Sequence, residues 1–168
     1  MTRRLHVGFA APSREHVDEF WRVGTAAGFR DYGAPGPRPQ YSDTYYGAFL
    51  LDPDGNSIEA VPHDAVHTRG RIDHVWMRVA DVAATKRFYE TVAPFTGFEL
   101  VVDEPTHASF RGAGAGFTLV PGPPTENAQL AFLARENAIV EAFADAYGSH
   151  VLDPDGNLFE VVNRDRGT

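Results

Sequence analysis

Two glutamates, Glu59 and Glu160, stand at the same position of a stretch that the chain writes twice. Residues 51–61 read LDPDGNSIEAV and residues 152–162 read LDPDGNLFEVV, so eight of eleven positions are identical. A carboxylate buried on such an apolar stretch costs several kcal/mol unless it has a metal ion, a polar partner or water. These two side chains are therefore candidates for chemistry. The alternative is a solvated carboxylate at a rim, or one that bonds the backbone of the tight turn that the DPDG residues of each copy are predicted to form.

Two histidines, His6 and His74, occupy matching positions near the start of the apolar stretches LHVGFAA and IDHVWMRV. Side chains alternate between the two faces of a strand. Each histidine therefore lies on the face opposite an all-apolar one, which we expect to pack under a helix. Gln129 takes the same position in a third such stretch. We expect the second face to gather the histidines, Gln129 and the two glutamates.

Three further residues are candidates for substrate binding: Trp76, Arg78 and Tyr45. The arginine could hold an anionic substrate group through a charge-assisted pair. The alternatives are core packing for the aromatic rings and a surface ion pair for the arginine. Because Tyr45 and Tyr46 are neighbours, only one of them can face inward.

The elements that position these residues recur along the chain as an internal repeat. The predicted organisation is a βαβββ module at 5–63, a linker at 64–71, a second module at 72–120, a linker at 121–127, and a shortened module at 128–163. Ser13 and Asp81 are expected to cap the two first helices. The segment 34–44, APGPRPQYSDT, has three prolines and is predicted to be a loop. The third module lacks 22 residues that correspond to the second strand and this loop.

Composition excludes several classes of protein. The 168 residues include no cysteine, which rules out disulfides, thiolate metal sites and a cysteine nucleophile. A formal charge of −8 disfavours nucleic acid as a partner. No apolar run approaches the length of a membrane span, and no secretory signal is present, so we expect a cytoplasmic protein. The motifs of serine hydrolases, P-loop proteins and dinucleotide-binding proteins are missing.

The sequence resembles the vicinal oxygen chelate superfamily, which contains glyoxalase I, bleomycin-binding proteins and extradiol dioxygenases. The resemblance rests on His6-Val7, on His74-Val75 followed by Phe88-Tyr89, and on the two LDPDGN stretches with their glutamates. It implies an α+β fold in which βαβββ modules form a cupped half-barrel sheet with the helices outside. It also implies a divalent metal ion (Zn, Ni, Co, Mn or Fe(II)) held by His6, His74 and Glu59.

The chain departs from the family pattern in two respects. The modules stand in reversed order, and the last strand of the second module, GFTLV, has no carboxylate. Two pairings of modules therefore stay open. The first unites His6, Glu59 and His74, and the second unites His74 with Gln129 and Glu160. An unpaired module could complete its cup across a homodimer.

The resemblance implies a glyoxalase-like metal-dependent lyase, isomerase or transferase that acts on a small substrate with vicinal oxygens. Glu160 would then be a second-site ligand or a catalytic general base. One alternative is a metal-free small-molecule binding protein of the bleomycin-resistance type. A second alternative is an extradiol-type dioxygenase, because two histidines and one carboxylate also suit Fe(II).

Overall fold

The computed structural model describes residues 1–62, 71–112 and 115–163. The chain forms two compact units, an N-terminal unit of Arg4–Trp76 and a C-terminal unit of Met77–Thr168 together with Met1–Arg3. Strand β5 (Arg71–Val79) begins in the first unit and ends in the second. Of the predicted linker 64–71, residues 64–70 lie outside the described residues.

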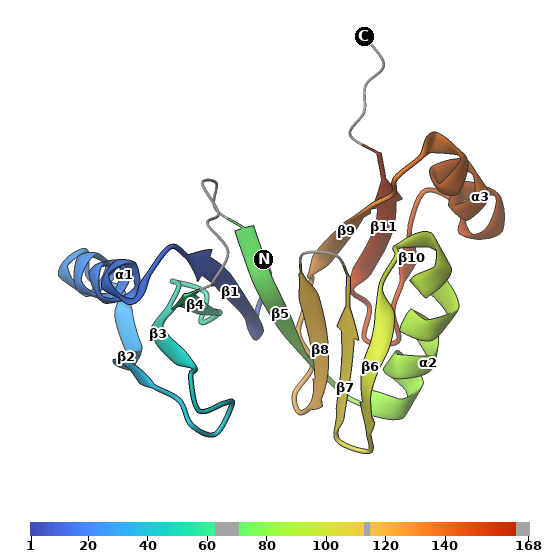
Figure 1. The fold of residues 1–168 in the computed structure, drawn as a ribbon. Coiled ribbons are helices and arrows are strands. Elements are labelled where there is room, and N and C mark those ends of the chain that lie inside the picture. The colour runs from blue at the N-terminus through green and yellow to red at the C-terminus, as the bar shows by residue number, and fades with distance from the viewer. Residues whose placement is uncertain (63–70, 113–114, 164–168) are drawn as a thin grey trace, which may run out of the picture. The chain divides into compact units, whose positions relative to one another are not determined.

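In its described residues, the N-terminal unit holds one helix on a sheet whose strand order is β2-β3-β4-β1-β5 (Figure 1). Its other elements are β1 (Leu5–Ala11), α1 (Arg14–Ala26), β2 (Arg30–Pro37), β3 (Tyr46–Leu51) and β4 (Ser57–Pro62). β1 runs parallel to β4, whereas β3 is antiparallel to both β4 and β2. Val17 of α1 packs on Ala48 and Ala60 of the sheet, and all three are buried. This packing leaves the opposite face of β3 and β4 to the polar residues.

In the first and third modules, the repeated turn ties the start of the first strand to the last strand. Asp52 accepts hydrogen bonds from the backbone N–H groups of Asp54 and Asn56, at 2.9 and 2.8 Å, and Gly55 adopts φ +83°. The amide oxygen of Asn56 accepts the backbone N–H of Leu5, 3.0 Å away. The second copy repeats this bond from Ala128 to Asn157, also at 3.0 Å. The predicted turns are confirmed, and their asparagines fix where β1 and β9 (Gln129–Leu133) begin.

Two local predictions were wrong. β2 continues to Pro37, into the segment predicted to be a loop. β2 is an edge strand, where prolines are tolerated because one side of the strand needs no ladder donors, and its register shifts around Gly33 and Gly36. Ser13 stands at the N-cap of α1, but its hydroxyl bonds His16 instead of a backbone N–H. Asp81 caps α2 (Val82–Val92) as predicted, by accepting a hydrogen bond from the backbone N–H of Ala84.

The part of the C-terminal unit that the structure describes contains two helices, a short 3₁₀ turn and two groups of strands. They are α2 (Val82–Val92), η1 (Ala93–Phe95), β6 (Glu99–Glu104), β7 (His107–Arg111), β8 (Gly116–Pro121), β9 (Gln129–Leu133), α3 (Asn137–Tyr147), β10 (Val151–Leu152) and β11 (Leu158–Val162). The strand orders are β5-β8-β7-β6 and β10-β11-β9. The predicted α+β class with βαβββ modules is confirmed. Among the described helices, none has the length and apolar character needed to cross a bilayer.

Aromatic rings form the core of the C-terminal unit. Phe159 of the third module stacks on Phe132 with ring centroids 4.8 Å apart and also meets Tyr89 of α2 at 6.0 Å. Tyr89 in turn contacts Phe117 of β8 at 4.8 Å. The shortened module is therefore packed into the same core as the second module.

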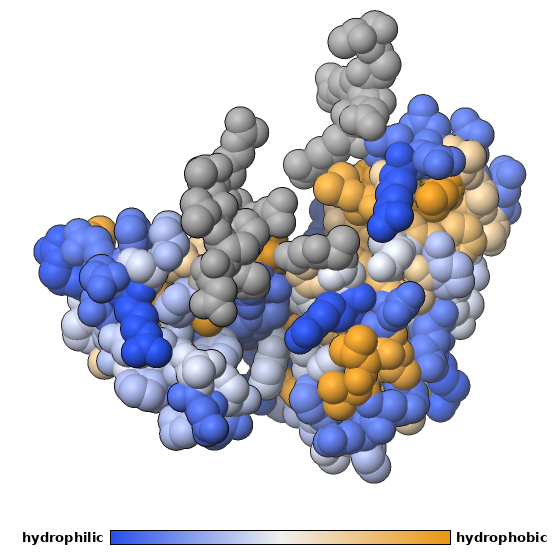
Figure 2. All heavy atoms as spheres, in the orientation of Figure 1, coloured by the Kyte–Doolittle hydropathy of each residue, from blue (hydrophilic) through white to orange (hydrophobic). Residues whose placement is uncertain are grey.

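Figure 2 shows hydrophobic side chains gathered over β6 and β7, where Val101 is exposed.

Candidate metal centre

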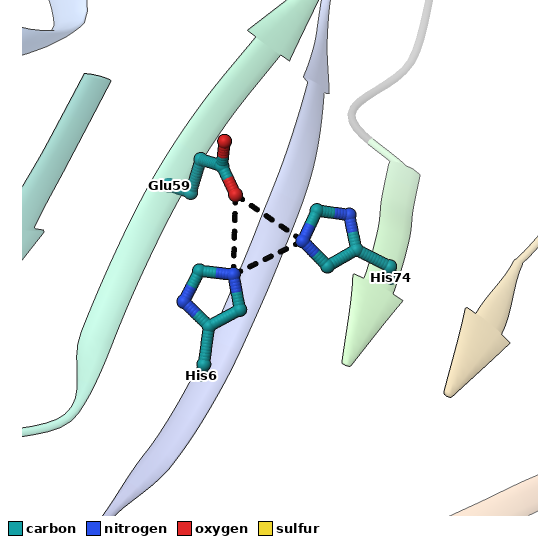
Figure 3. Close-up of side chains that lie close together, drawn as sticks. All are labelled: His6, Glu59 and His74. Atoms are coloured by element: carbon teal, nitrogen blue, oxygen red, sulfur yellow. Dashed lines mark hydrogen bonds and ion pairs between the residues drawn. The ribbon is translucent and has the colours of Figure 1, made fainter. Parts of the chain in front are cut away.

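Three side chains of the N-terminal unit, those of His6, Glu59 and His74, point toward one another (Figure 3), on the face of the sheet opposite the one that packs on α1. The Nε2 atoms of His6 and His74 lie 3.0 Å apart. Oε2 of Glu59 lies 3.1 Å from the first nitrogen and 3.2 Å from the second. The three residues come from β1, β4 and β5. Two imidazole nitrogens and one carboxylate oxygen thus converge within hydrogen-bonding distance of one another.

Strand register explains why these residues meet although they are far apart in the sequence. In the parallel β1–β4 pair, His6 lies beside Ser57 and Gly8 lies beside Glu59. The bond between Leu5 and Asn56 sets this register at the start of both strands. β5 flanks β1 on its other side and brings His74 over the strand.

Two glycines make room for the converging side chains. A β-carbon on Gly8 would overlap the imidazole ring of His74. A β-carbon on Gly47 of β3 would lie 2.5 Å from Oε1 of Glu59, which is closer than real β-carbons approach. The site therefore needs glycine at both positions because ligand side chains lie flat over β1 and β3.

Each of the three side chains also has a polar partner on the side away from the shared centre. Nδ1 of His6 lies 3.0 Å from the hydroxyl of Ser57, and Nδ1 of His74 lies 2.8 Å from the carboxylate of Asp73. The phenol of Tyr45 donates to Oε1 of Glu59 at 2.8 Å. Such outer partners orient metal ligands and tune their basicity. Both histidines consequently turn Nε2 toward the shared centre.

The electrostatics of the centre follow from burial and from these hydrogen bonds. Burial acts to raise the pKa of Glu59, yet hydrogen bonds from His6, His74 and Tyr45 together hold it below its usual value. Burial acts to lower the pKa of His74, but its bonds to Asp73 and Glu59 raise that pKa to about 9. Burial and the charge of Glu59 raise the pKa of Tyr45 far above its usual value. Tyr45 therefore stays protonated and donates.

The donor set fits a divalent metal ion. Two ligand atoms bound at right angles, each about 2.1 Å from one ion, lie about 3.0 Å apart, and the observed separations are 3.0–3.2 Å. Within the described part of the chain, these three residues are the one group of histidine and acidic side chains able to hold an ion. Glu59 is 1% exposed and the histidines 20% and 16%, so the ligand atoms are largely shielded from water.

The remaining predicted site residues have different surroundings. The ring of Trp76 lies 6.1 Å from that of His6 and 6.0 Å from that of Tyr41, so it flanks the centre. Tyr45 contacts Glu59, whereas Tyr46 turns to α1 and donates to Asp18 at 2.6 Å. The prediction that one of these two neighbours faces inward is therefore confirmed.

Arg78 and Glu160 belong to the C-terminal unit. Arg78 is exposed, and its side chain lies along Gly122. Glu160 is half-buried on β11 and accepts a hydrogen bond from the amide of Gln129 at 3.1 Å. Gln129 and Glu160, which the second pairing placed with His74, thus pair with each other. His74 directs its ring nitrogens to His6, Glu59 and Asp73.

Sequence reasoning missed the residues that support the centre. Asp73 adjoins His74 in the sequence, and that adjacency was the available signal. Ser57 and Gly47 carry no such signal, because their roles depend on strand register and on close packing. Arg38 directly follows β2, and its guanidinium lies over the ring of Phe49.

Comparisons with known proteins agree with this architecture. Residues 71–144 match the family model of the Glyoxalase/Bleomycin resistance protein/Dioxygenase superfamily. Glyoxalase I from Zea mays is similar in structure, with a TM-score of 0.60 and 19% identity over 96% of this chain and 68% of that chain. A putative dioxygenase from Bacillus subtilis subsp. subtilis str. 168 has a TM-score of 0.66 and 15% identity, covering 96% of this chain and 62% of that chain.

No curated protein matches the chain. At identities below 20%, the structural likenesses concern the fold alone. The family model matches residues 71–144 and the fold likeness extends over nearly the whole chain, so the chain is similar to proteins of the glyoxalase/bleomycin resistance/dioxygenase superfamily.

Proposed function

We propose that the chain is a metal-dependent enzyme of the glyoxalase type, a lyase, isomerase or transferase acting on a small substrate with two vicinal oxygens. One observation carries the proposal: the Nε2 atoms of His6 and His74 and Oε2 of Glu59 converge within 3.2 Å, and each side chain is held from behind. An isolated ion-pair cluster would not need three separate outer partners to aim its members at one point.

In the proposed enzyme, the chain's own residues would bind the metal ion and orient the side chains that hold it. A bound divalent ion would supply Lewis acidity toward two adjacent substrate oxygens. The ionised Glu59 balances part of that charge in a buried setting, and Asp73 and Ser57 fix the directions of the two imidazoles. Trp76 and Tyr41 provide an aromatic flank against which an apolar part of a substrate can pack. Glu160, which belongs to the C-terminal unit, is proposed to be a second-site ligand or a general base, and its removal is included in the experiment below.

A dioxygenase is the second candidate because two histidines and one carboxylate are the donor set of non-haem Fe(II) oxygenases. The fold likeness to the putative dioxygenase from Bacillus subtilis agrees with this candidate. Oxygen consumption with catechol by the Fe(II)-loaded protein would favour it over the lyase or isomerase. A metal-free binding protein of the bleomycin-resistance type is the remaining candidate and predicts ligand binding without metal.

Metal content per chain tests the proposal directly. Tag-free protein is exposed in turn to Ni, Co, Mn, Zn and Fe(II), and bound metal is measured by elemental analysis. We expect close to one ion per chain in the wild type and in Glu160→Ala, and loss of the ion in His6→Ala, His74→Ala and Glu59→Ala. Absence of metal from the wild type under every condition would reject the metalloenzyme and favour the binding protein. Glu160→Ala that keeps metal but loses activity would support its role as a base.

We also propose that the chain forms a homodimer. Val101, Leu133 and Leu152 of the C-terminal unit are each more than half exposed, and self-association is a common way to cover such side chains. The molar mass from light scattering should be twice that of the 18.4 kDa chain, and a monomeric mass would contradict the proposal.

A further inference from the structure

We infer that Arg38 forms an anion-binding subsite beside the metal centre, so that the substrate is a small planar carboxylic acid with its vicinal oxygens at the opposite end. The inference rests on the proposed function, because it assigns the substrate class of the same site. It is carried by the placement of Arg38 on the face of the sheet that holds the three ligand side chains.

A row of paired positions across the sheet places Arg38 on this face. Gly33 of β2 pairs with Phe49 of β3, and Phe49 pairs with Glu59 of β4. Directly opposed residues of neighbouring strands point to the same side of a sheet. The guanidinium of Arg38 lies over the ring of Phe49, 5.4 Å from its centroid. Arg38, the ring of Phe49 and Glu59 therefore lie on the same face of the sheet.

The guanidinium is held in place without a charged partner. It donates to the backbone oxygens of Ala34 and Pro37, at 2.6 and 3.2 Å. A guanidinium has five N–H donors, so three remain beyond these two bonds. Within the described residues no carboxylate pairs with Arg38, whereas Arg22 is paired with Glu19.

Glycines leave the space that the guanidinium uses. A β-carbon on Gly33 would lie 3.4 Å from one terminal nitrogen of Arg38, and one on Gly36 would lie 3.2 Å from the other. Both contacts are tighter than most real β-carbon contacts. The irregular register of β2 at these two glycines thus accommodates the arginine over the sheet.

Distance sets the size of the substrate. The Phe49 ring centroid is 5.4 Å from the guanidinium carbon and 6.0 Å from the His6 ring centroid. These two separations limit the distance from guanidinium to imidazole to about 11 Å. After contact distances at both ends, the space suits a skeleton of about one six-membered ring. Phe49 offers an aromatic surface for such a planar skeleton.

The test compares two probes that differ by one carboxylate. Binding of 3,4-dihydroxybenzoate and of catechol to the Zn-loaded protein is measured by titration calorimetry, with the metal-free protein as reference. We expect the dihydroxybenzoate to bind about tenfold more tightly than catechol, since a charge-assisted pair is added. Arg38→Gln should remove this difference while keeping one Zn per chain.

Arg14→Gln is the matched control, because Arg14, like Arg38, lies over an aromatic ring. Its guanidinium carbon is 5.0 Å from the ring centroid of Tyr46. Tyr46 bonds to α1, so Arg14 belongs to the other face, and its loss should leave the tenfold preference intact. Metal-dependent binding of both probes with equal affinity would overturn the subsite and spare the proposed function. A preference that survives in Arg38→Gln would also overturn it. Absence of metal-dependent binding by either probe would reject both the function and the subsite.

Discussion

Glu59 uses its two carboxylate oxygens for two separate purposes. Oε2 faces both histidines, and Oε1 is turned toward β3, where it accepts the phenol of Tyr45. A carboxylate with one oxygen engaged in this way would bind a metal through the other oxygen alone. At the scale of single residues, Tyr45 therefore supports a ligand, although the sequence suggested that it binds substrate.

Replacement of Tyr45 by phenylalanine tests this role. The buried Oε1 would lose its donor, and we expect Zn affinity to fall by about 10- to 100-fold, as for other outer partners of metal ligands. Competition with a chromophoric chelator measures the affinity. Tyr46→Phe is the control, because its phenol bonds Asp18 on α1, and it should leave the affinity unchanged. Equal affinities in both variants would show that Tyr45 does not orient Glu59.

At the scale of elements, close approach between strands and ligand side chains builds the centre. Gly47 on β3 and Gly8 on β1 lie beneath Glu59 and His74, and side chains there would occupy the space of the ligands. The repeated turn contributes in another way, since Asn56 ties the start of β1 to that of β4. The duplicated DPDGN stretch is thus explained by its structural task and needs no catalytic one.

Gly47→Ala tests the close approach. Its β-carbon would lie 2.5 Å from Oε1 of Glu59, so the carboxylate has to move and break its bond with Tyr45. We expect at least about a tenfold loss of Zn affinity, with the circular dichroism of the fold retained. Gly36→Ala serves as the control, because its nearest neighbour is the flexible end of Arg38. Metal affinity equal to that of the wild type in Gly47→Ala would contradict the account.

At the scale of the whole molecule, the two units have different kinds of interior. The C-terminal unit is built on an aromatic core that includes Phe132 and Phe159 of the shortened module. The N-terminal unit buries an ionised carboxylate and a protonated histidine on one face of its sheet. The stability of the metal-free chain should therefore depend on pH through this second interior.

We expect the metal-free chain to lose stability as pH rises from about 6.5 to about 9. The pKa of His74 is about 9 in the folded chain and about 6.5 when unfolded. A group whose pKa is raised in the folded chain contributes its full stabilisation below its unfolded pKa. This contribution is lost as pH rises through the folded pKa. The loss amounts to about 2–3 kcal/mol, measurable by urea unfolding with tryptophan fluorescence. Asp73→Asn should reduce the loss, and His16→Gln should leave it unchanged, since His16 lies exposed on α1.

The sequence by itself predicted the repeat and the α+β class. Alternation along a strand is a local pattern, and it placed both histidines, Gln129 and both glutamates on the faces opposite the helices. The choice of His6, His74 and Glu59 came from the family resemblance, and the sequence left two pairings of modules open. The strands were also predicted locally, except the end of β2, where the edge position of the strand outweighed Pro35 and Pro37.

Tertiary structure decided what surrounds the centre. The distances among the three ligand atoms, the partners of Tyr45 and Ser57, and the clearance at Gly8 and Gly47 depend on which strands are neighbours and in which register. Arg38 came to lie beside the site because an edge strand with shifted register carried it onto that face. Register and side-chain approach arise from contacts between distant segments, and a local pattern in the sequence does not encode them.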